Sequence, residues 1–173
     1  PTVGLRVPDH TLALAFLNAF KKIGGKGVAA PSANRFGHVS PTSSKAVHDE
    51  LGEYLAPDDL ILDGGPSQVG VESTIIDCTA DAPRILRPGA ITVEMVEAVT
   101  GVTVVNRDDV IRVSGSLEHH YAPSAEVVLD GHPRPGDGLI ALNTFPTPEG
   151  AVRLASPINN EDFARQLYGA LRD

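Results

Sequence analysis

The chain has 173 residues, 42% of them apolar, with 17 glycines, 14 prolines and a formal charge of −8. Its apolar content is enough to bury a core, while its acidic charge disfavours tight, sequence-independent binding to a nucleic-acid backbone. Cys78 is the only cysteine, which excludes an internal disulfide and a cysteine-based metal cluster and fits a reducing compartment. No apolar run approaches the roughly 20 residues of a membrane span and no signal peptide is visible, so we expect a cytoplasmic protein.

The first forty residues predict two strands separated by a helix. Residues 3–7 form a short apolar run that ends at a proline, which is typical of a strand. Asp9 is a plausible N-cap for a helix with apolar residues at helical spacing, and the glycine pair after residue 23 would end it. We expect a second strand at residues 27–30, followed at once by a polar loop at residues 31–41.

The middle of the chain predicts further short elements. Thr42 or Ser43 would cap the next helix. The alternation of strands and helices indicates a mixed α/β sheet covered by helices. We expect strands at residues 60–62, 73–77 and 85–86 and a helix at residues 92–99.

A polar stretch divides the chain in two. We interpret residues 105–123 as a linker that follows a domain at residues 1–104. Residues 124–173 would form a small, incomplete α/β domain with strands at 125–129 and 139–142 and an amphipathic helix at 161–171. The chain opens inside an expected strand without an initiator Met, and its last helix stops abruptly. We therefore expect it to be a fragment of a longer protein.

The loop after the second expected strand has the side chains of an anion site. Ser32 and Asn34 lie two residues apart, so in an extended chain they would point to the same side and offer a hydroxyl and an amide to phosphate oxygens. Ser40 precedes an expected helix N-terminus, where anions are attracted. A plain capping loop has the same composition, so the residues alone leave both interpretations open.

Three further residues are candidates for ligand contacts. Ser73 could bond a carboxylate or hydroxyl at the entry to a strand, or be an ordinary strand-edge residue. Arg87 ends a short strand, where it could clamp a phosphate or make a surface ion pair. Arg6 lies within an apolar run, where an unpaired charge is costly, so it needs a partner. A ligand carboxylate, Asp63 or Glu72 could supply that partner.

Other catalytic patterns are missing from the sequence. It has no P-loop, Rossmann fingerprint or Ser-His-Asp order. His119 and His120 are adjacent and cannot easily converge on one ion, and no third ligand is obvious, so we expect no metal site in the chain. The residues by themselves indicate a soluble α/β domain, and they leave a site for a phosphate-bearing ligand and an ordinary capping loop both open.

Short motifs occur in a characteristic order. They are L-R-V-P at residues 5–8, A-P-S-A-N at 30–34, G-V-E-S-T-I at 70–75, L-R-P-G at 86–89 and H-Y-A-P at 120–123. Together they resemble the YrdC-like domain of threonylcarbamoyl-AMP synthases, in the two-domain form of that enzyme. The resemblance implies a twisted mixed α/β sheet with an open cavity. It also implies a nucleotidyltransferase that converts L-threonine, bicarbonate and ATP, with Mg²⁺, to threonylcarbamoyl-AMP and pyrophosphate.

The resemblance also implies a role for individual residues. Arg6 would bind the threonine carboxylate, and the backbone of Ala30 and the side chain of Ser73 would complete the amino-acid pocket. No covalent nucleophile is implied, because a carbamate oxygen attacks the α-phosphate. A tRNA-modifying threonylcarbamoyl transferase complex would receive the product. The residues implied in ATP binding are Thr2, Ser32, Asn34, Ser40, Arg87 and Tyr121, the last as a lid over the cavity.

The chain departs from the family in one respect. The family's N-terminal half carries a Lys-Gly-Arg-Pro-like basic motif that contacts ATP, and this sequence lacks it. We therefore expect the chain to lack the N-terminal half of the catalytic domain and to be inactive by itself. Two alternatives are a YrdC-like module that binds RNA weakly without catalysis, which the acidic charge opposes, and a carbamoyl transferase of hydrogenase maturation. The latter would bring acylphosphatase and zinc-finger segments, which are not visible.

Overall fold

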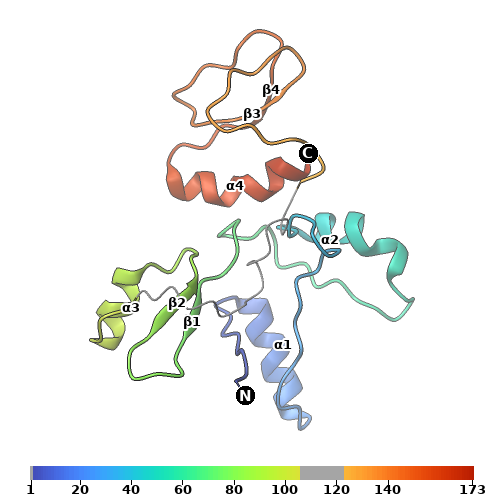
Figure 1. Ribbon diagram of the computed structural model, residues 1–173. Coiled ribbons are helices and arrows are strands. Elements are labelled where there is room, and N and C mark those ends of the chain that lie inside the picture. Colours follow the sequence, from blue (N-terminus) through green and yellow to red (C-terminus); the bar gives the residue numbers. More distant parts are fainter. Residues whose placement is uncertain (1, 106–122) are drawn as a thin grey trace.

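The computed structural model describes residues 2–105 and 123–173, and Figure 1 shows its helices and strands. Helices and short strands are mixed along the described chain, so the α/β class expected from the sequence is confirmed. The elements are α1 (Thr11–Lys22), α2 (Ser44–Leu51), the 3-10 turn η1 (Gly52–Tyr54), β1 (Ile75–Asp77), β2 (Arg84–Arg87), α3 (Val93–Thr100), β3 (Gly138–Ile140), β4 (Val152–Ala155) and α4 (Asn160–Arg172).

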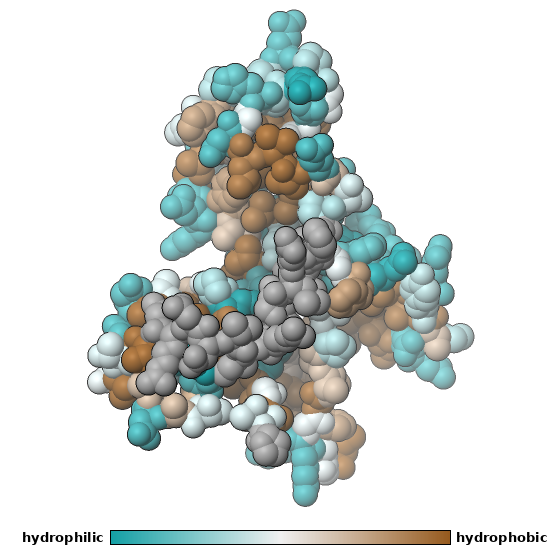
Figure 2. Space-filling model, viewed as in Figure 1, coloured by the Kyte–Doolittle hydropathy of each residue, from teal (hydrophilic) through white to brown (hydrophobic). Residues whose placement is uncertain are grey.

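The elements form small groups that meet near the middle of the molecule (Figure 1). α1 lies beside the N-terminal segment, α2 continues into η1, β1 and β2 lie beside α3, and α4 lies under β3 and β4. Hydrophobic residues gather on the face of the β3–β4 group seen in Figure 2. The groups share little core, and the buried apolar side chains of the described part are Val39, Val96, Val104, Ala155, Pro157 and Ala170.

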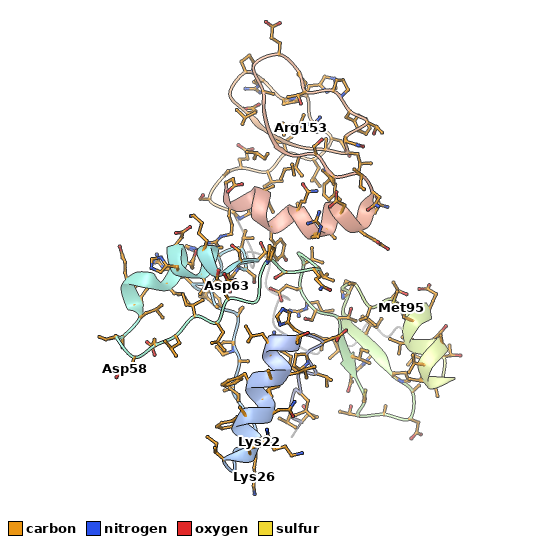
Figure 3. The ribbon with its side chains drawn as sticks, turned by 180° about the vertical axis from the view of Figure 1, so that it is seen from behind. Lys22, Lys26, Asp58, Asp63, Met95 and Arg153 are labelled. Carbon is orange, nitrogen blue, oxygen red and sulfur yellow. The ribbon has the colours of Figure 1, made fainter. Side chains whose placement is uncertain are left out.

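The strands form two separate two-stranded sheets. β1 pairs antiparallel with β2, with Asp77 opposite Arg84. These two side chains form an ion pair of 2.6 Å. Hydrogen bonds from Thr79 and from Arg84 lower the pKa of Asp77 to about 2. β3 pairs parallel with β4. Arg153 of β4 braces this second sheet by donating to the Ala141 carbonyl at 2.9 Å, inside the group at the top of Figure 3.

The helices confirm most of the expected boundaries. Ser43, one of the two expected caps, accepts a hydrogen bond from the Ala46 amide at the start of α2. Thr92 caps α3 in the same way. The expected cap of α1 is wrong, because His10 and not Asp9 occupies the N-cap position. The His10 ring is turned away from the helix and contacts the Gly64 carbonyl at 3.3 Å, so it makes no cap bond.

Several expected strands are wrong. Residues 3–7, 27–30, 60–62 and 125–129 form no strand in the described part of the chain. Strand pairing needs a neighbouring backbone to satisfy each N–H and C=O group, and these segments have none beside them among the described residues. Their side chains are correspondingly exposed, as Val7 is at 91%. The described residues form two small sheets, one in each of the two α/β regions expected from the sequence, and β4 was not expected.

Candidate functional site

A pocket of about 320 Å³ lies where segments from both ends of the chain meet. Its walls come from residues 31–33, 40–42, 67 and 69–73, with one residue each from the N-terminal segment, α2 and α4. This volume is at the lower end of the roughly 300–1,000 Å³ that small-molecule sites have. Among the candidates from the sequence, Arg6, Ser32, Ser40 and Ser73 line the pocket.

The two expected amino-acid contacts with side chains reach the pocket. Arg6 is exposed at its rim, and no hydrogen bond or ion pair to it is found within residues 2–105 and 123–173. The expectation that Arg6 is buried in a strand and needs a partner is wrong, because the segment is open to solvent. Asp63, near the middle of the molecule in Figure 3, instead accepts from the Gly65 amide at 2.9 Å. Ala30, the third expected contact, directly precedes a lining residue but does not line the pocket itself.

Ser32 and Asn34 do not point to the same side as expected. The Asn34 amide donates to the Ser32 carbonyl at 2.9 Å, so the loop is turned rather than extended and the two-residue rule does not apply. The Asn34 side chain bonds inside its own loop, donating to the Arg35 and His38 carbonyls at 3.0 and 2.9 Å. Asn34 therefore shapes the loop, while Ser32 faces the pocket.

Glu72 joins two of the expected nucleotide contacts. Ser40 donates to one Glu72 carboxylate oxygen at 2.5 Å, and the Arg87 guanidinium lies 3.6 Å from the other. Arg87 also donates twice to the Ser73 carbonyl, at 3.0 and 2.8 Å, and does not line the pocket. Sequence reasoning considered Glu72 only as a partner for Arg6. Its position between Ser40 and Arg87 depends on contacts across 32 and 15 residues of chain, which no local pattern reveals.

The motifs at residues 70–75 and 86–89 meet at a close backbone contact. A side chain on Gly89 would place its Cβ 2.4 Å from the Thr74 nitrogen and 2.6 Å from the Glu72 carbonyl oxygen. Only glycine fits there, since real Cβ atoms keep at least 3.0 Å from such atoms. The Thr74 hydroxyl completes the contact by donating to the Ile91 carbonyl at 2.9 Å. This packing holds residues 72–74 against residues 87–91 behind the pocket.

The remaining candidates lie away from the pocket or cannot be described. Thr2 is exposed and does not line it. Tyr121, His119 and His120 lie outside the described residues. The described part of the chain contains no group of three or more His, Cys, Asp or Glu side chains that could hold a metal ion. None of its helices is long and apolar enough to cross a membrane.

Comparison with known families identifies this arrangement. Residues 1–89 match the family model described as telomere recombination, which covers Sua5, YciO and YrdC. The chain belongs to this Sua5/YciO/YrdC family. Residues 91–173 match the model described as the C-terminal domain of threonylcarbamoyl-AMP synthase. The resemblance drawn from the sequence motifs is therefore confirmed at the level of the family.

Curated relatives of this family member carry the same enzyme name. The threonylcarbamoyl-AMP synthase of Bacillus subtilis is 41% identical over 138 residues, which are 76% of this chain and 38% of that protein. The enzyme of the same name from Pyrococcus abyssi is 37% identical over 139 residues, 77% of this chain and 39% of that protein. The chain thus spans about two fifths of the length of these relatives.

Solved structures of the family share the fold. The structure of Pyrococcus abyssi Sua5 complexed with L-threonine matches with a TM-score of 0.72 and 31% identity, over 96% of this chain and 53% of that one. A double alanine variant of the same protein matches with a TM-score of 0.70 and 30% identity, over 96% of this chain and 52% of that one. The agreement extends across both matched family regions.

Proposed function

We propose that the protein to which these residues belong is an L-threonylcarbamoyladenylate synthase. It converts L-threonine, bicarbonate and ATP to threonylcarbamoyl-AMP and pyrophosphate. The observation that carries the proposal is the convergence of Arg6, Ser32, Ser40 and Ser73 on one pocket, although they lie up to 67 residues apart. The curated relatives, which are named for this activity, and a related structure that holds L-threonine support it.

The threonine half of the proposed site consists of Arg6, Ser73 and the backbone next to Ala30. The exposed Arg6 guanidinium can form a charge-assisted bond with the amino-acid carboxylate, which is stronger than a neutral bond. Arg87 contributes from behind by holding the Ser73 carbonyl with two hydrogen bonds. The Ser73 hydroxyl then has a defined position from which to bond the carboxylate or hydroxyl of threonine.

The nucleotide half consists of Ser32, Ser40 and the N-terminus of α2. The two hydroxyls can donate to phosphate oxygens, and the positive end of the α2 dipole lies just after Ser40. Asn34 supports the loop, and we retain Thr2, Arg87 and the Tyr121 lid as proposed nucleotide contacts. ATP enters as its Mg²⁺ complex, and Mg²⁺ commonly uses one or two carboxylates besides phosphate oxygens. Glu72 is the carboxylate that lines the pocket.

The chemistry needs orientation and charge neutralisation, with no covalent protein intermediate. The amine of threonine forms a bond to the bicarbonate carbon, and one C–O bond of bicarbonate breaks with release of water to leave a carbamate. One carbamate oxygen then forms a bond to the α-phosphorus, and the bond from that phosphorus to the oxygen that bridges to the β-phosphate breaks. Pyrophosphate leaves with the electron pair. Holding the two reactants in line can lower such a barrier substantially, and donors aimed at the phosphate oxygens stabilise the developing charge.

The proposal also assigns the domains of the chain and the fate of the product. Residues 1–104 would form part of the catalytic domain, residues 105–123 the linker and residues 124–173 part of a smaller domain, in a cytoplasmic enzyme. Its product would be passed to a threonylcarbamoyl transferase complex that modifies tRNA.

The test is threonine-dependent release of pyrophosphate from ATP and bicarbonate by the full-length protein. Calorimetry should show that Arg6→Ala weakens threonine binding at least about tenfold while leaving ATP affinity nearly unchanged, since a lost charged hydrogen bond is worth roughly 1.5–3 kcal/mol. Ser32→Ala should weaken ATP selectively. Ser156→Ala, an exposed serine after β4, is the matched control and should change neither affinity. Absence of threonine-dependent pyrophosphate release from the wild-type protein would refute the proposal.

A further inference from the structure

A cluster of charged side chains around Glu50 ties α4 to the loop that carries Ser32 and Ser40. We call Arg35, His38, Glu50 and Arg172 the Glu50 cluster. One Glu50 carboxylate oxygen accepts from the Arg35 amide at 3.1 Å and lies 2.8 Å from the His38 Nδ1 atom. The other accepts from the Arg172 guanidinium at 2.8 Å. Arg172 lies 122 residues further along the chain, near the end of α4.

Arg172 holds the loop directly as well as through Glu50. Its Nη1 atom donates to the Val39 carbonyl at 2.7 Å, and its Nη2 atom also lies 3.4 Å from the Ala46 carbonyl. Val39 is only 3% exposed and immediately precedes Ser40. A planar guanidinium is suited to bridging several fixed oxygens at once, which a lysine ammonium on its flexible stem does less well. One side chain of α4 therefore fixes points on both sides of Ser40.

The Glu50–Arg172 ion pair at the centre of the cluster is largely shielded from solvent, whereas the His38 side chain is 49% exposed. The Glu50 side chain is 8% exposed and that of Arg172 is 18% exposed. Burial raises the pKa of Glu50, but hydrogen bonds from Arg172 and the Arg35 amide outweigh it and hold that pKa below its usual value. A buried ion pair is tolerated only when its hydrogen bonds are well satisfied, and removing one partner leaves a costly charge. The Glu50–Arg172 ion pair therefore connects α2 to α4 in a fixed geometry, whereas the Lys45–Asp49 pair lies exposed within α2.

The same helix also forms part of the pocket wall. Tyr168 lines the pocket one turn before Arg172. The buried Gly70, another lining residue, packs so closely on the helix that a Cβ there would meet the Arg165 carbonyl oxygen at 2.2 Å. In Figure 1 the C-terminal end of α4 lies above α2, in agreement with these contacts.

We propose that Arg172 is a positioning residue for nucleotide binding. Through Glu50 and the Val39 carbonyl it holds residues 35–40 in the shape that presents Ser32 and Ser40 to the phosphates of ATP. The identity of the ligand rests on the proposed function, whereas the hold on the loop does not. A region of the chain that matches the C-terminal domain model thus completes the nucleotide site.

The test uses the full-length protein, with Arg172→Met as the main variant and Glu50→Gln/Arg172→Met as the second. The single variant leaves the buried Glu50 charge without its partner, which could prevent folding. The double variant removes both charges and avoids this problem. Arg165→Met is the matched control, because Arg165 lies on the same helix with a half-exposed side chain that pairs with Asp162. Amide hydrogen exchange without ligand reports on the loop, and calorimetry reports on ATP and threonine separately.

In both Arg172 variants we expect the Arg35 amide to exchange at least about tenfold faster, since its protection depends on Glu50 staying in place. We expect the ATP dissociation constant to rise at least about tenfold, while threonine binding changes less than about twofold. Arg172→Lys should lie between these variants and wild type. The proposal would be overturned if both variants kept the wild-type amide exchange rate at Arg35 and the wild-type affinity for ATP. Equal losses of affinity for ATP and for threonine would also overturn it, because they indicate a general loosening of the fold. Failure of the wild-type protein to bind ATP counts instead against the proposed function, and the exchange experiment still tests the hold on the loop.

Discussion

The contact between Gly70 and α4 predicts that one substitution will have opposite effects at two glycines. Adding a methyl group at Gly70 places a Cβ 2.2 Å from the Arg165 carbonyl oxygen and 2.5 Å from that of Ala164. Because such contacts need at least 3.0 Å, α4 or the Gly70 segment must move by close to an ångström. Neither neighbour is a flexible side chain, so the strain falls on the backbone.

The size of the destabilisation by Gly70→Ala follows from the cost of overpacking. Forcing an extra methyl group into a packed contact typically costs about 1–3 kcal/mol. For a protein of this size each kcal/mol lowers the melting temperature by about 2–4 °C, so Gly70→Ala should lower it by roughly 2–12 °C. Gly169→Ala lies on α4 itself and should do the reverse. Its nearest neighbour is the Thr42 hydroxyl at 3.8 Å, and alanine is favoured over glycine inside a helix by about 1 kcal/mol.

The assay is thermal unfolding followed by circular dichroism, together with calorimetry of ATP binding on the same samples. We expect Gly70→Ala to melt lower and to weaken ATP binding, because moving α4 displaces both Tyr168 and Arg172. Gly169→Ala should melt at or above the wild-type temperature and bind ATP normally. Equal melting temperatures for the two variants would refute the packing of α4 against Gly70.

Three further predictions test the remaining contacts. Hydrogen bonds from Gln166 and the Ile158 amide, with help from Arg165, lower the pKa of Asp162 to about 2. This carboxylate therefore stabilises the fold above its unfolded pKa near 4 and loses that contribution as the pH falls towards 2, so Asp162→Asn should flatten the acid side of a plot of melting temperature against pH. An unchanged acid limb would contradict the Asp162 contacts. Glu72→Gln should weaken ATP binding by roughly three- to tenfold, because Ser40 and Arg87 lose a charged partner worth about 1 kcal/mol more than a neutral one; calorimetry with unchanged ATP affinity would argue against this. Arg87→Ala should weaken threonine as well as ATP, because Arg87 anchors the Ser73 carbonyl; a threonine affinity equal to wild type would show that this anchor is dispensable.

The sequence predicted those parts of the fold that local rules control. Helix caps depend on a few neighbouring residues, so Ser43 could be named in advance as one of two candidate caps, and the helix after Thr92 could be placed within a residue. The antiparallel pair of β1 and β2 also arises from nearby segments. The run at residues 3–7 was misread because an apolar alternation indicates a strand only when a partner backbone is present, and none of the described residues supplies one.

The same distinction separates the site residues that could be predicted from those that could not. Ser32 and Ser73 belong to short motifs whose order carries the resemblance, Ser40 precedes an expected helix N-terminus, and all three line the pocket. Glu50 and Arg172 belong to no motif, and their pairing depends on how α4 folds back across more than a hundred residues. Asn34 was expected to point to the same side as Ser32 because an extended loop was assumed, whereas the turn at Ser32 directs its side chain into the loop.

The charges of the pocket explain why the shape of the loop matters so much. Arg6 is its one cationic lining residue among those described, and Glu72, its one anionic lining residue, is already bonded to Ser40. The described lining therefore provides little net positive charge of its own for the proposed polyphosphate ligand. What these residues would add to nucleotide affinity then depends on hydroxyl and amide donors, whose bonds weaken steeply when distance or angle is wrong. The proposed contribution of these residues thus rests on the placement of Ser32 and Ser40, which the Glu50 cluster would hold in position.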